Sequence, residues 1–332
     1  MIQPKSIWIN LDEKEVDVTY LDKRFSEKGY HFIKKDIKKD ENLTIEMARN
    51  IDVIISILEP WNKKTLNSIK GKKKFIMRYG TGLDNIDMPY ATKLGIPVAN
   101  IPGVNSAAVA EIALIHILNV GRRFFQCVQG VKEGIYPSKI TGNELDNKTV
   151  GLIGLGTIAR QLVRMLKGFD VNIIAYDPFL DSIGKQFATD AHIILYNTME
   201  KVFSNSDIVS LHIPLNNSTK ECIGSDILKT AKPGLYLINT CRGGVIDEKA
   251  LVRALKAKVI RGVGLDVLYQ EPPEKNNPLL KMDNVWITSH IGAASIESEQ
   301  RSQIIIADTI DAFFEGKIPS NIKNPETLKN QG

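Results

Sequence analysis

Three residues of complementary chemistry, Arg242, Glu271 and His290, each come directly after a run rich in apolar residues. A guanidinium can bind a carboxylate through two parallel hydrogen bonds and polarise the neighbouring carbonyl. An imidazole can donate or accept a proton near neutral pH, and a carboxylate can orient that imidazole and keep it protonated. The set therefore suits the transfer of a hydride and a proton to the carbonyl of a 2-oxo acid. The preceding runs are 235–241, 264–270 and 285–289.

Each of these residues alone has an ordinary structural explanation. Arg242 could form a surface ion pair, Glu271 could lie in the loop that continues into two prolines, and a lone histidine such as His290 is more often structural than catalytic. Their shared position after strands carries the argument, because the carboxyl ends of parallel strands meet at one edge of a sheet and ligands bind there. We expect the three side chains to converge.

A glycine-rich turn between a predicted strand and a predicted helix provides the strongest local motif. Gly154, Gly156 and Ala159 match the pattern G-x-G-x-x-A. The first glycine permits the tight turn, the second lets the backbone approach a diphosphate, and the alanine lets the helix pack on the strand. The diphosphate is expected at the N-terminus of the helix that begins near Ile158. This context favours a dinucleotide site over a glycine turn without a ligand.

An acidic residue follows at the spacing that such a site requires. Asp177 lies 21 residues after Gly156, at the end of the next predicted strand, and no Arg or Lys follows it directly. A carboxylate at this point accepts hydrogen bonds from ribose hydroxyls and repels a 2′-phosphate. The sequence therefore predicts NAD as the cofactor in preference to NADP.

Short β-branched runs alternate with helical patterns along almost the whole chain. Several runs carry three or more consecutive apolar residues, which is typical of strands buried on both faces of a parallel sheet. The alternation predicts an α/β protein with doubly wound parallel sheets and right-handed crossovers. The predicted strands are 6–10, 52–58, 74–79, 97–100, 149–154, 171–176, 207–213, 235–240, 262–268 and 285–288.

A long apolar helix is expected at 106–125, with Ser106 as its N-terminal cap, and a domain boundary is expected near residue 100. The glycine motif lies near the middle of the chain, so one domain is expected to be inserted into the other. A C-terminal helix at about 295–315 is expected to return to the first domain.

Composition excludes several classes of protein. The 332 residues carry a net charge of +5, and the basic clusters at 34–39 and 72–74 read as solvated surface and not as a nucleic-acid site. Three scattered cysteines suit neither a disulfide framework nor a zinc site. No apolar run could cross a membrane and no signal peptide is seen, so a cytoplasmic protein without a metal is expected.

Several longer motifs, taken together, resemble the D-isomer-specific 2-hydroxyacid dehydrogenase family, and the resemblance extends from about residue 78 to about residue 324. Among its members, the motifs are most similar to those of phosphoglycerate and glycerate/hydroxypyruvate dehydrogenases. The motifs are RYGTGLDNID (78–87), NIPGVNSAAVAE (100–111), GLGTIA (154–159), LHIPL (211–215), NTCRGG (239–244), GLDV (264–267), EP (271–272) and SHIGA (289–293).

The resemblance implies roles for individual residues. Arg242 would bind the substrate carboxylate and carbonyl, His290 would be the acid–base, Glu271 would orient it, and Asp266 would hold the nicotinamide carboxamide. The implied cofactor-binding residues are Gly154, Gly156, Thr157, Ile158, Asp177, His212, Pro214, Thr219, Thr240, Cys241, Asp266 and Gly292. The implied residues for a small anionic substrate are Arg78, Tyr79, Gly80, Thr81, Arg242 and His290.

The resemblance also implies two Rossmann-like domains and an assembly. Residues 1–100 and 291–332 would form a discontinuous substrate domain, and 101–290 would form the inserted NAD-binding domain. Family members are typically homodimers that use the helix expected at 106–125, and the two domains close by a hinge motion. Neither a nucleic-acid nor a membrane partner is expected.

Three departures from the family pattern are present, of which Ala159, in place of the more frequent glycine, is tolerated in the family. Thr157 stands where many members carry arginine, which removes a cation from the diphosphate site, and Ser289 stands where many carry proline. His212 could be only a packed strand residue, and Cys241 lacks a neighbouring base that would make it a nucleophile. An NAD(H)-sensing protein similar to the corepressors of this fold, or a phosphite-type dehydrogenase, could keep the same three residues.

Overall fold

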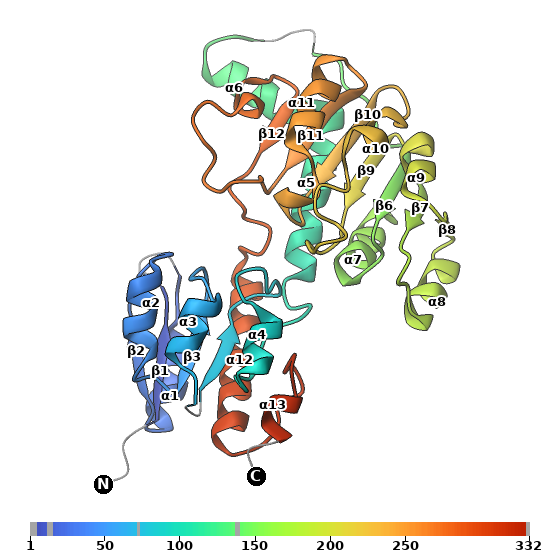
Figure 1. Ribbon diagram of the computed structural model, residues 1–332. Coiled ribbons are helices and arrows are strands. Elements are labelled where there is room, and N and C mark those ends of the chain that lie inside the picture. Colours follow the sequence, from blue (N-terminus) through green and yellow to red (C-terminus); the bar gives the residue numbers. More distant parts are fainter. Residues whose placement is uncertain (1–4, 12–15, 72–73, 137–139, 330–332) are drawn as a thin grey trace. The chain divides into compact units, whose positions relative to one another are not determined.

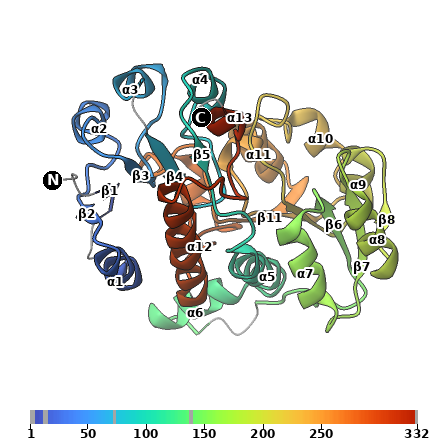
Figure 2. The same cartoon turned by 90° about the horizontal axis from the view of Figure 1, so that it is seen from below.

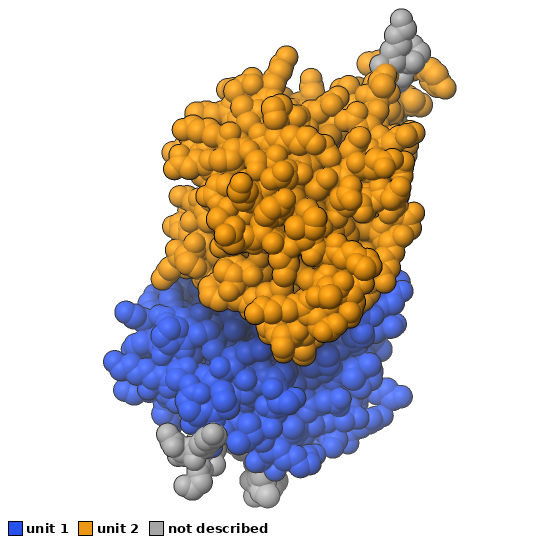
Figure 3. Space-filling view, turned by 90° about the vertical axis from the view of Figure 1, so that its right-hand side faces the viewer, with its two compact units in different colours: residues 1–104, 295–332 blue, residues 105–294 orange. Residues whose placement is uncertain are grey.

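The computed structural model describes residues 5–11, 16–71, 74–136 and 140–329. The chain forms two compact units, which Figure 3 distinguishes by colour. The first unit comprises Met1–Val104 and Ser295–Gly332, and the second comprises Asn105–Ala294. Both divisions fall a few residues after the positions expected from the sequence. Each unit is built on a parallel sheet, as the apolar runs predict.

The first unit contains a five-stranded parallel sheet in the order β2-β1-β3-β4-β5 (Figure 1). The register pairs Ile7 of β1 with Val53 of β3, and Ile54 of β3 with Ile76 of β4. All four of these side chains are fully buried, because helices cover both faces of the sheet. The strands are β1 (Ser6–Ile9), β2 (His31–Lys34), β3 (Val53–Ser56), β4 (Phe75–Arg78) and β5 (Val98–Ala99).

The helices of the first unit form two layers, which are visible on either side of the sheet in Figure 2. Helices α1 and α12 cover one face, where Phe25 and Ile306 are fully buried. Helices α2, α3 and α4 cover the other face with Ala48, Leu66 and Ala91. The helices are α1 (Thr19–Glu27), α2 (Glu41–Ala48), α3 (Lys63–Ser68), α4 (Met88–Lys93), α12 (Ile296–Phe314) and α13 (Glu326–Lys329).

The predicted return of the C-terminal helix is confirmed. Ser295 caps α12 by accepting a hydrogen bond from the Ser298 amide at 3.1 Å. Arg24 of α1 forms an ion pair with Asp311 of α12 at 2.9 Å, and the Asp311 side chain is almost fully buried. The helix therefore completes a core that begins in the first hundred residues.

The second unit contains a seven-stranded parallel sheet in the order β12-β11-β10-β9-β6-β7-β8. The strand order reverses at β6. The chain runs from β6 outward through β7 to β8, and it then returns to the other side of β6, where β9 pairs with it. Ligands bind outside the carboxyl ends of strands at such a reversal. The strands are β6 (Thr149–Ile153), β7 (Asn172–Tyr176), β8 (Ile194–Leu195), β9 (Ile208–Leu211), β10 (Leu235–Asn239), β11 (Ile260–Leu265) and β12 (Val285–Ile287).

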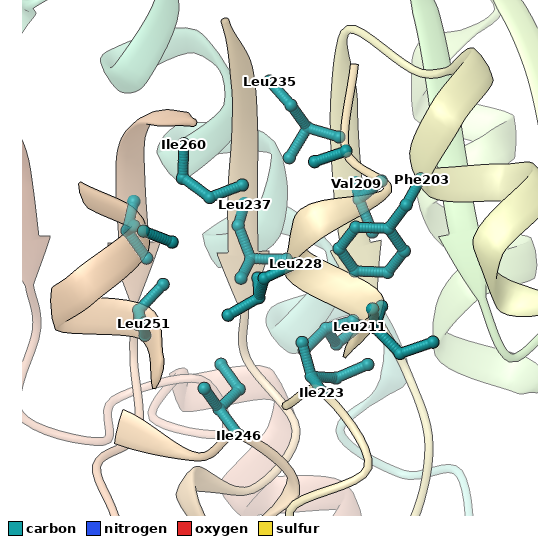
Figure 4. Close-up of a cluster of buried hydrophobic side chains, with 14 of the residues drawn as sticks. Phe203, Val209, Leu211, Ile223, Leu228, Leu235, Leu237, Ile246, Leu251 and Ile260 are labelled. Atoms are coloured by element: carbon teal, nitrogen blue, oxygen red, sulfur yellow. The ribbon is translucent and has the colours of Figure 1, made fainter. Parts of the chain in front are cut away.

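Helices also cover both faces of the second sheet. One face packs against α9, α10 and α11 through an apolar cluster that includes Phe203, Leu228 and Leu251 (Figure 4). The other face packs against α5 and α7 through Ile117 and Leu162. The helices are α5 (Ser106–Arg122), α6 (Phe124–Lys132), α7 (Thr157–Leu166), α8 (Ser182–Asp190), α9 (Met199–Asn205), α10 (Ser225–Lys229) and α11 (Glu248–Lys256), with 3-10 turns at Gly243–Val245 and Pro278–Lys281.

The prediction of a single helix at 106–125 is wrong in two details. Arg123 adopts a left-handed conformation (φ 56°) and separates α5 from α6, so the helical run continues past residue 125 in a new direction. Ser106 lies inside α5, and the flanking residue Asn105 makes no capping hydrogen bond through its side chain. A left-handed arginine has no clear sequence signal, because glycine, or sometimes asparagine, is the usual residue in this conformation at a helix end.

Two strands were not predicted. Strand β2 is half exposed at the sheet edge, and both residues of the short strand β8 are exposed. Strand β2 lacks a run of three apolar residues, whereas β8 lies within the apolar run 193–196, which was not assigned to a strand. Across the described ranges, no helix combines the length and apolarity needed to cross a membrane.

Candidate active site

The structure joins Glu271 and His290 directly. The Nδ1 atom of His290 lies 2.7 Å from Oε2 of Glu271. The other carboxylate oxygen, Oε1, accepts a hydrogen bond from the Leu268 amide at 2.9 Å. The glutamate is therefore anchored to the end of the β11 segment while it orients the imidazole. With Nδ1 engaged, Nε2 is the ring atom left to exchange a proton with a ligand.

The electrostatics of this pair include Arg242. Burial opposes ionisation of Glu271, but the hydrogen bonds from His290 and Leu268, together with the charges of His290 and Arg242, outweigh it and hold the pKa of Glu271 below its usual value. Arg242 thus acts on the same carboxylate, as expected from the convergence of the strand ends. The side chains of His290 and Glu271 are 48% and 36% exposed, so a solute can reach them.

Asn239 holds the segment that carries Arg242. Its Nδ2 donates to the Arg242 carbonyl at 2.9 Å, and its Oδ1 accepts from the Cys241 amide at 3.0 Å. The Arg242 guanidinium donates to the Cys241 carbonyl at 2.7 Å. This fully buried asparagine ends β10 and was not singled out from the sequence, where it looked like any polar strand terminus.

The glycine turn has the geometry of a dinucleotide cradle. Gly154 has a φ of 89°, and a Cβ atom there would lie 2.5 Å from the His212 carbonyl oxygen, so only glycine fits. Gly156 faces open space, and α7 begins after it without any capping side chain. The amides at the start of α7 are consequently available to an anion. Thr157 is exposed, and its hydroxyl lies 3.3 Å from that of Ser106.

Asp177 is placed at the carboxyl end of β7, beside this turn. Its Oδ2 accepts from the Leu155 amide at 2.9 Å, and its Oδ1 accepts from the Phe179 amide at 3.0 Å. The carboxylate thus stabilises the glycine turn and remains partly exposed at its rim. Ile158, the next candidate along α7, is half-buried.

Two buried polar atoms near the same strand ends have no partner in the described part of the chain. They are Nε2 of His212, after β9, and Oγ1 of Thr240, after β10. Burial lowers the pKa of His212 to about 4, so its ring is neutral. Thr219 closes the adjoining turn by donating to the Pro214 carbonyl at 2.6 Å. Unpaired polar atoms, an uncapped helix and an open glycine together fit a bound dinucleotide.

Asp266 and Gly292 are buried, and Cys241 is half-buried. Burial raises the pKa of Cys241 to about 11, which leaves the thiol protonated and unsuited to nucleophilic attack. Asp266 is 1% exposed, and its Oδ2 accepts from the Gly292 amide at 2.7 Å. Gly292 therefore contacts Asp266 directly. Thr288, which also binds Asp266, was missed by sequence reasoning, as was the buried His116.

The remaining substrate-binding candidates follow β4 in the first unit. The guanidinium of Arg78 donates to the carbonyls of Ser56, Tyr79 and Gly82 at 2.5–3.2 Å. Gly80 has a φ of 139°, Thr81 is exposed, and the buried hydroxyl of Tyr79 has no partner among the described residues. The residues after β4 thus form an irregular turn whose backbone is stiffened by Arg78. In the ranges that the structure covers, no group of three or more His, Cys, Asp or Glu could hold a metal ion.

Comparison with known proteins agrees with this geometry. Residues 114–292 match the family described as "D-isomer specific 2-hydroxyacid dehydrogenase, NAD binding domain". The chain is 36% identical over 305 residues to a glyoxylate reductase of Korarchaeum cryptofilum, covering 89% of this chain and 90% of that protein. It is 37% identical over 290 residues to a D-3-phosphoglycerate dehydrogenase of Methanocaldococcus jannaschii, covering 86% of this chain and 54% of that protein.

A solved structure extends the comparison to the fold. The chain matches an acyclic imino acid reductase in complex with NADPH and D-arginine, with a TM-score of 0.84 and 27% identity, over 96% of this chain and 99% of that one. The NAD(P)-binding domain is inserted within the substrate domain, as the resemblance implied. The chain belongs to the D-isomer specific 2-hydroxyacid dehydrogenase family and is an NAD(P)-dependent oxidoreductase that acts on CH–OH groups.

Proposed function

We propose that the chain is a reductase of small, unphosphorylated 2-oxo acids, with glyoxylate and hydroxypyruvate as the leading substrates and NADH as the preferred reductant. The observation that carries the proposal is the Glu271–His290 hydrogen bond of 2.7 Å beside the positive charge of Arg242. An oriented acid–base next to a carboxylate-binding cation is what carbonyl reduction of an anionic acid requires.

Each residue has a separate role in the proposed reduction. The nicotinamide, when bound, supplies the hydride to the carbonyl carbon. Arg242 binds the substrate carboxylate and polarises the carbonyl oxygen. His290 donates the proton on Nε2 to that oxygen, so that the C=O group becomes CH–OH. Glu271 holds the imidazolium through Nδ1, and in the reverse direction the same histidine accepts the hydroxyl proton.

The roles proposed for the cofactor residues follow from the cradle. The amides of Gly156 and Thr157 at the start of α7 would bind the diphosphate, and Asp177 would accept the ribose hydroxyls. The carboxylate disfavours a 2′-phosphate, which supports NADH over NADPH. His212 and Thr240 would pair their buried polar atoms with the cofactor. Ile158, Pro214, Thr219, Cys241, Asp266 and Gly292 would line the remaining surface.

The preference for an unphosphorylated acid rests on Arg78. Three of its hydrogen bonds go to backbone carbonyls, two in its own turn and one at Ser56 on β3, so this guanidinium is engaged with the backbone. We propose that the backbone at Tyr79, Gly80 and Thr81 binds the carboxylate end of the substrate, with Arg78 as its support. The relationship to the glyoxylate reductase, which spans almost the whole of both chains, supports the same choice.

A kinetic panel tests this substrate choice. We expect kcat/KM for hydroxypyruvate and glyoxylate to exceed that for phosphohydroxypyruvate by at least about tenfold, and NADH to be preferred over NADPH. The loss of NAD(P)H absorbance measures both ratios. Faster turnover of phosphohydroxypyruvate would refute the substrate proposal. Tight NADH binding without any turnover would instead favour a cofactor-sensing protein.

We also propose a homodimer formed through α5 and α6. Helix α6 buries none of its residues within the chain, and Phe124 and Val131 are 59% and 53% exposed. Ile115 on α5 is 46% exposed as well. An apolar surface of this kind on one element is typical of a protein interface.

Because the three cysteines are free, we place the protein in a reducing compartment such as the cytoplasm.

Substitution on α6 tests the dimer. We expect Phe124→Asp to convert a dimer into a monomer, because a charge would have to be buried in the interface. Ile183→Asp is the matched control, since Ile183 is 70% exposed on α8 of the same unit and should leave the mass unchanged. Light scattering during size-exclusion chromatography measures the mass. A monomeric unaltered chain would contradict the proposal.

A further inference from the structure

The acid–base His290 has an unfavourable backbone conformation. Its φ is 56°, in the left-handed region, and its side chain is 48% exposed in the loop after β12. A residue other than glycine stays in this region only where its surroundings hold it there. The position of the imidazole therefore depends on what fixes the loop on either side of residue 290.

Asp266 provides that restraint. Its Oδ1 accepts from the Ile291 amide at 2.9 Å and its Oδ2 from the Gly292 amide at 2.7 Å, so one buried carboxylate binds the two amides that follow the histidine. A Cβ atom on residue 292 would lie 2.8 Å from Oδ2, so glycine is needed for this approach. The carboxylate acts as a clamp on the loop.

The clamp is itself held by two further side chains. Thr288 Oγ1 lies 2.6 Å from Oδ1 of Asp266, and Nε2 of His116 on α5 lies 3.1 Å from the same hydroxyl. The threonine has a single proton, which it donates to the carboxylate. It must then accept from His116, which fixes the imidazole as the tautomer protonated on Nε2.

The buried position of His116 is unfavourable for a polar side chain. Its side chain is 1% exposed in an otherwise apolar part of α5, and Nδ1 has no partner among the described residues. Burial keeps the pKa of His116 below its usual value, so the ring is neutral. On β11, a Cβ atom at Gly264 would lie 2.7 Å from the Cβ of His116, so a glycine is required there. A leucine would fill such a core position without an unpaired nitrogen.

We propose that His116 and Thr288 are positioning residues, which orient the Asp266 carboxylate so that it holds the His290 loop in its reactive conformation. The catalytic part of this inference rests on the proposed function, because it assigns the network to the acid–base step. The loop restraint itself does not depend on any substrate.

Two conservative pairs of variants test the proposal. His116→Leu and Thr288→Val remove the hydrogen bonds while preserving much of the volume, whereas His116→Gln and Thr288→Ser keep a donor or a hydroxyl. We expect the first two to lower kcat by about tenfold, less than the roughly hundredfold that a displacement of 1 Å can cause, and the second two to restore kcat to within about threefold. Thr230→Val, outside the network, is the matched control.

Two readouts separate positioning from general damage to the fold. A misplaced His290 should make proton transfer slower, so the solvent deuterium isotope effect on kcat should rise in His116→Leu and Thr288→Val. Amide hydrogen exchange at Ile291 and Gly292, measured without substrate, should accelerate at least about tenfold in Thr288→Val.

The outcomes are distinct. Unchanged exchange and unchanged kcat in His116→Leu and Thr288→Val would overturn the proposal. Equal losses in the conservative variants, together with lower melting temperatures and an unchanged isotope effect, would show a purely structural role and would also overturn it. If the unaltered chain turns over no 2-oxo acid, the proposed function fails, and the exchange data still decide whether the network holds the loop.

Discussion

His290→Ala is expected to lower kcat for reduction of a 2-oxo acid by about a thousandfold, since a positioned acid–base contributes on the order of a hundredfold to ten-thousandfold. In the proposed mechanism the alanine removes the group that donates the proton to the carbonyl oxygen, and no other histidine is hydrogen-bonded to Glu271 in the described residues. Steady-state kinetics with NADH and hydroxypyruvate measures the loss. NADH affinity, read from fluorescence quenching, should change less than about threefold.

His192→Ala is the matched control for this variant. His192 also has a left-handed φ, of 53°, but lies in the turn between α8 and β8. Its replacement should leave kcat within about twofold of the unaltered chain. A His290→Ala protein that keeps more than about a tenth of the original kcat would remove the histidine from the proposed mechanism.

Glu271→Gln gives the pH dependence of the same step. The pKa of Glu271 is held below its usual value, so the group is ionised across the neutral range and stabilises a protonated His290. Loss of that negative charge makes protonation of the imidazole less favourable. The alkaline limb of kcat/KM for reduction should therefore move to lower pH, and a shift to higher pH would contradict the pairing.

The second large effect is expected at Arg242. Arg242→Gln should lower kcat/KM for the 2-oxo acid by about a thousandfold, through a higher KM and a lower kcat, because the cation both binds the carboxylate and stabilises charge on the carbonyl oxygen. Arg242→Lys keeps the charge without the planar fork and should recover only part of the loss. The measurement is steady-state kinetics over a range of substrate concentrations.

An exposed arginine elsewhere in the same unit controls for loss of charge. Arg164 lies on α7, where it contacts Gln161, and Arg164→Gln should leave kcat/KM within about twofold. Formate or another small carboxylate should inhibit the unaltered chain more strongly than Arg242→Gln. Equal KM values in the unaltered chain and Arg242→Gln would exclude the arginine as the carboxylate ligand.

Much of the fold could be predicted because buried parallel strands leave continuous apolar runs. Strands β6, β9 and β10 are almost fully buried and were placed to within one or two residues. The edge strand β2 carries no such run, and the left-handed Arg123 that ends α5 has no composition signal. Strand β8 lies within the apolar run 193–196, but both of its residues are exposed at the sheet edge, so its apolar run does not reflect burial between two layers.

Some residues of the candidate site could likewise be predicted from the sequence, and others could not. The convergence of Arg242, Glu271 and His290 could be predicted because each is a charged or titratable residue after an apolar strand, and the sheet brings strand ends together. The network behind them could not. Its links to Asp266 run through the hydroxyl of Thr288, just after β12, and an imidazole on α5, 172 residues apart in sequence. Only packing reveals that His116, in an apolar helix, contacts Thr288 at the start of the loop that carries His290.

The most direct test of the central claim is the oxidation of NADH by hydroxypyruvate or glyoxylate, followed by absorbance with the unaltered chain and with His290→Ala at equal NADH occupancy. The account predicts steady turnover by the unaltered chain, formation of one 2-hydroxy acid per NADH consumed, and a loss of about a thousandfold in the variant. Turnover that is equal in the two proteins, or absent from the unaltered chain while NADH binds, would contradict it.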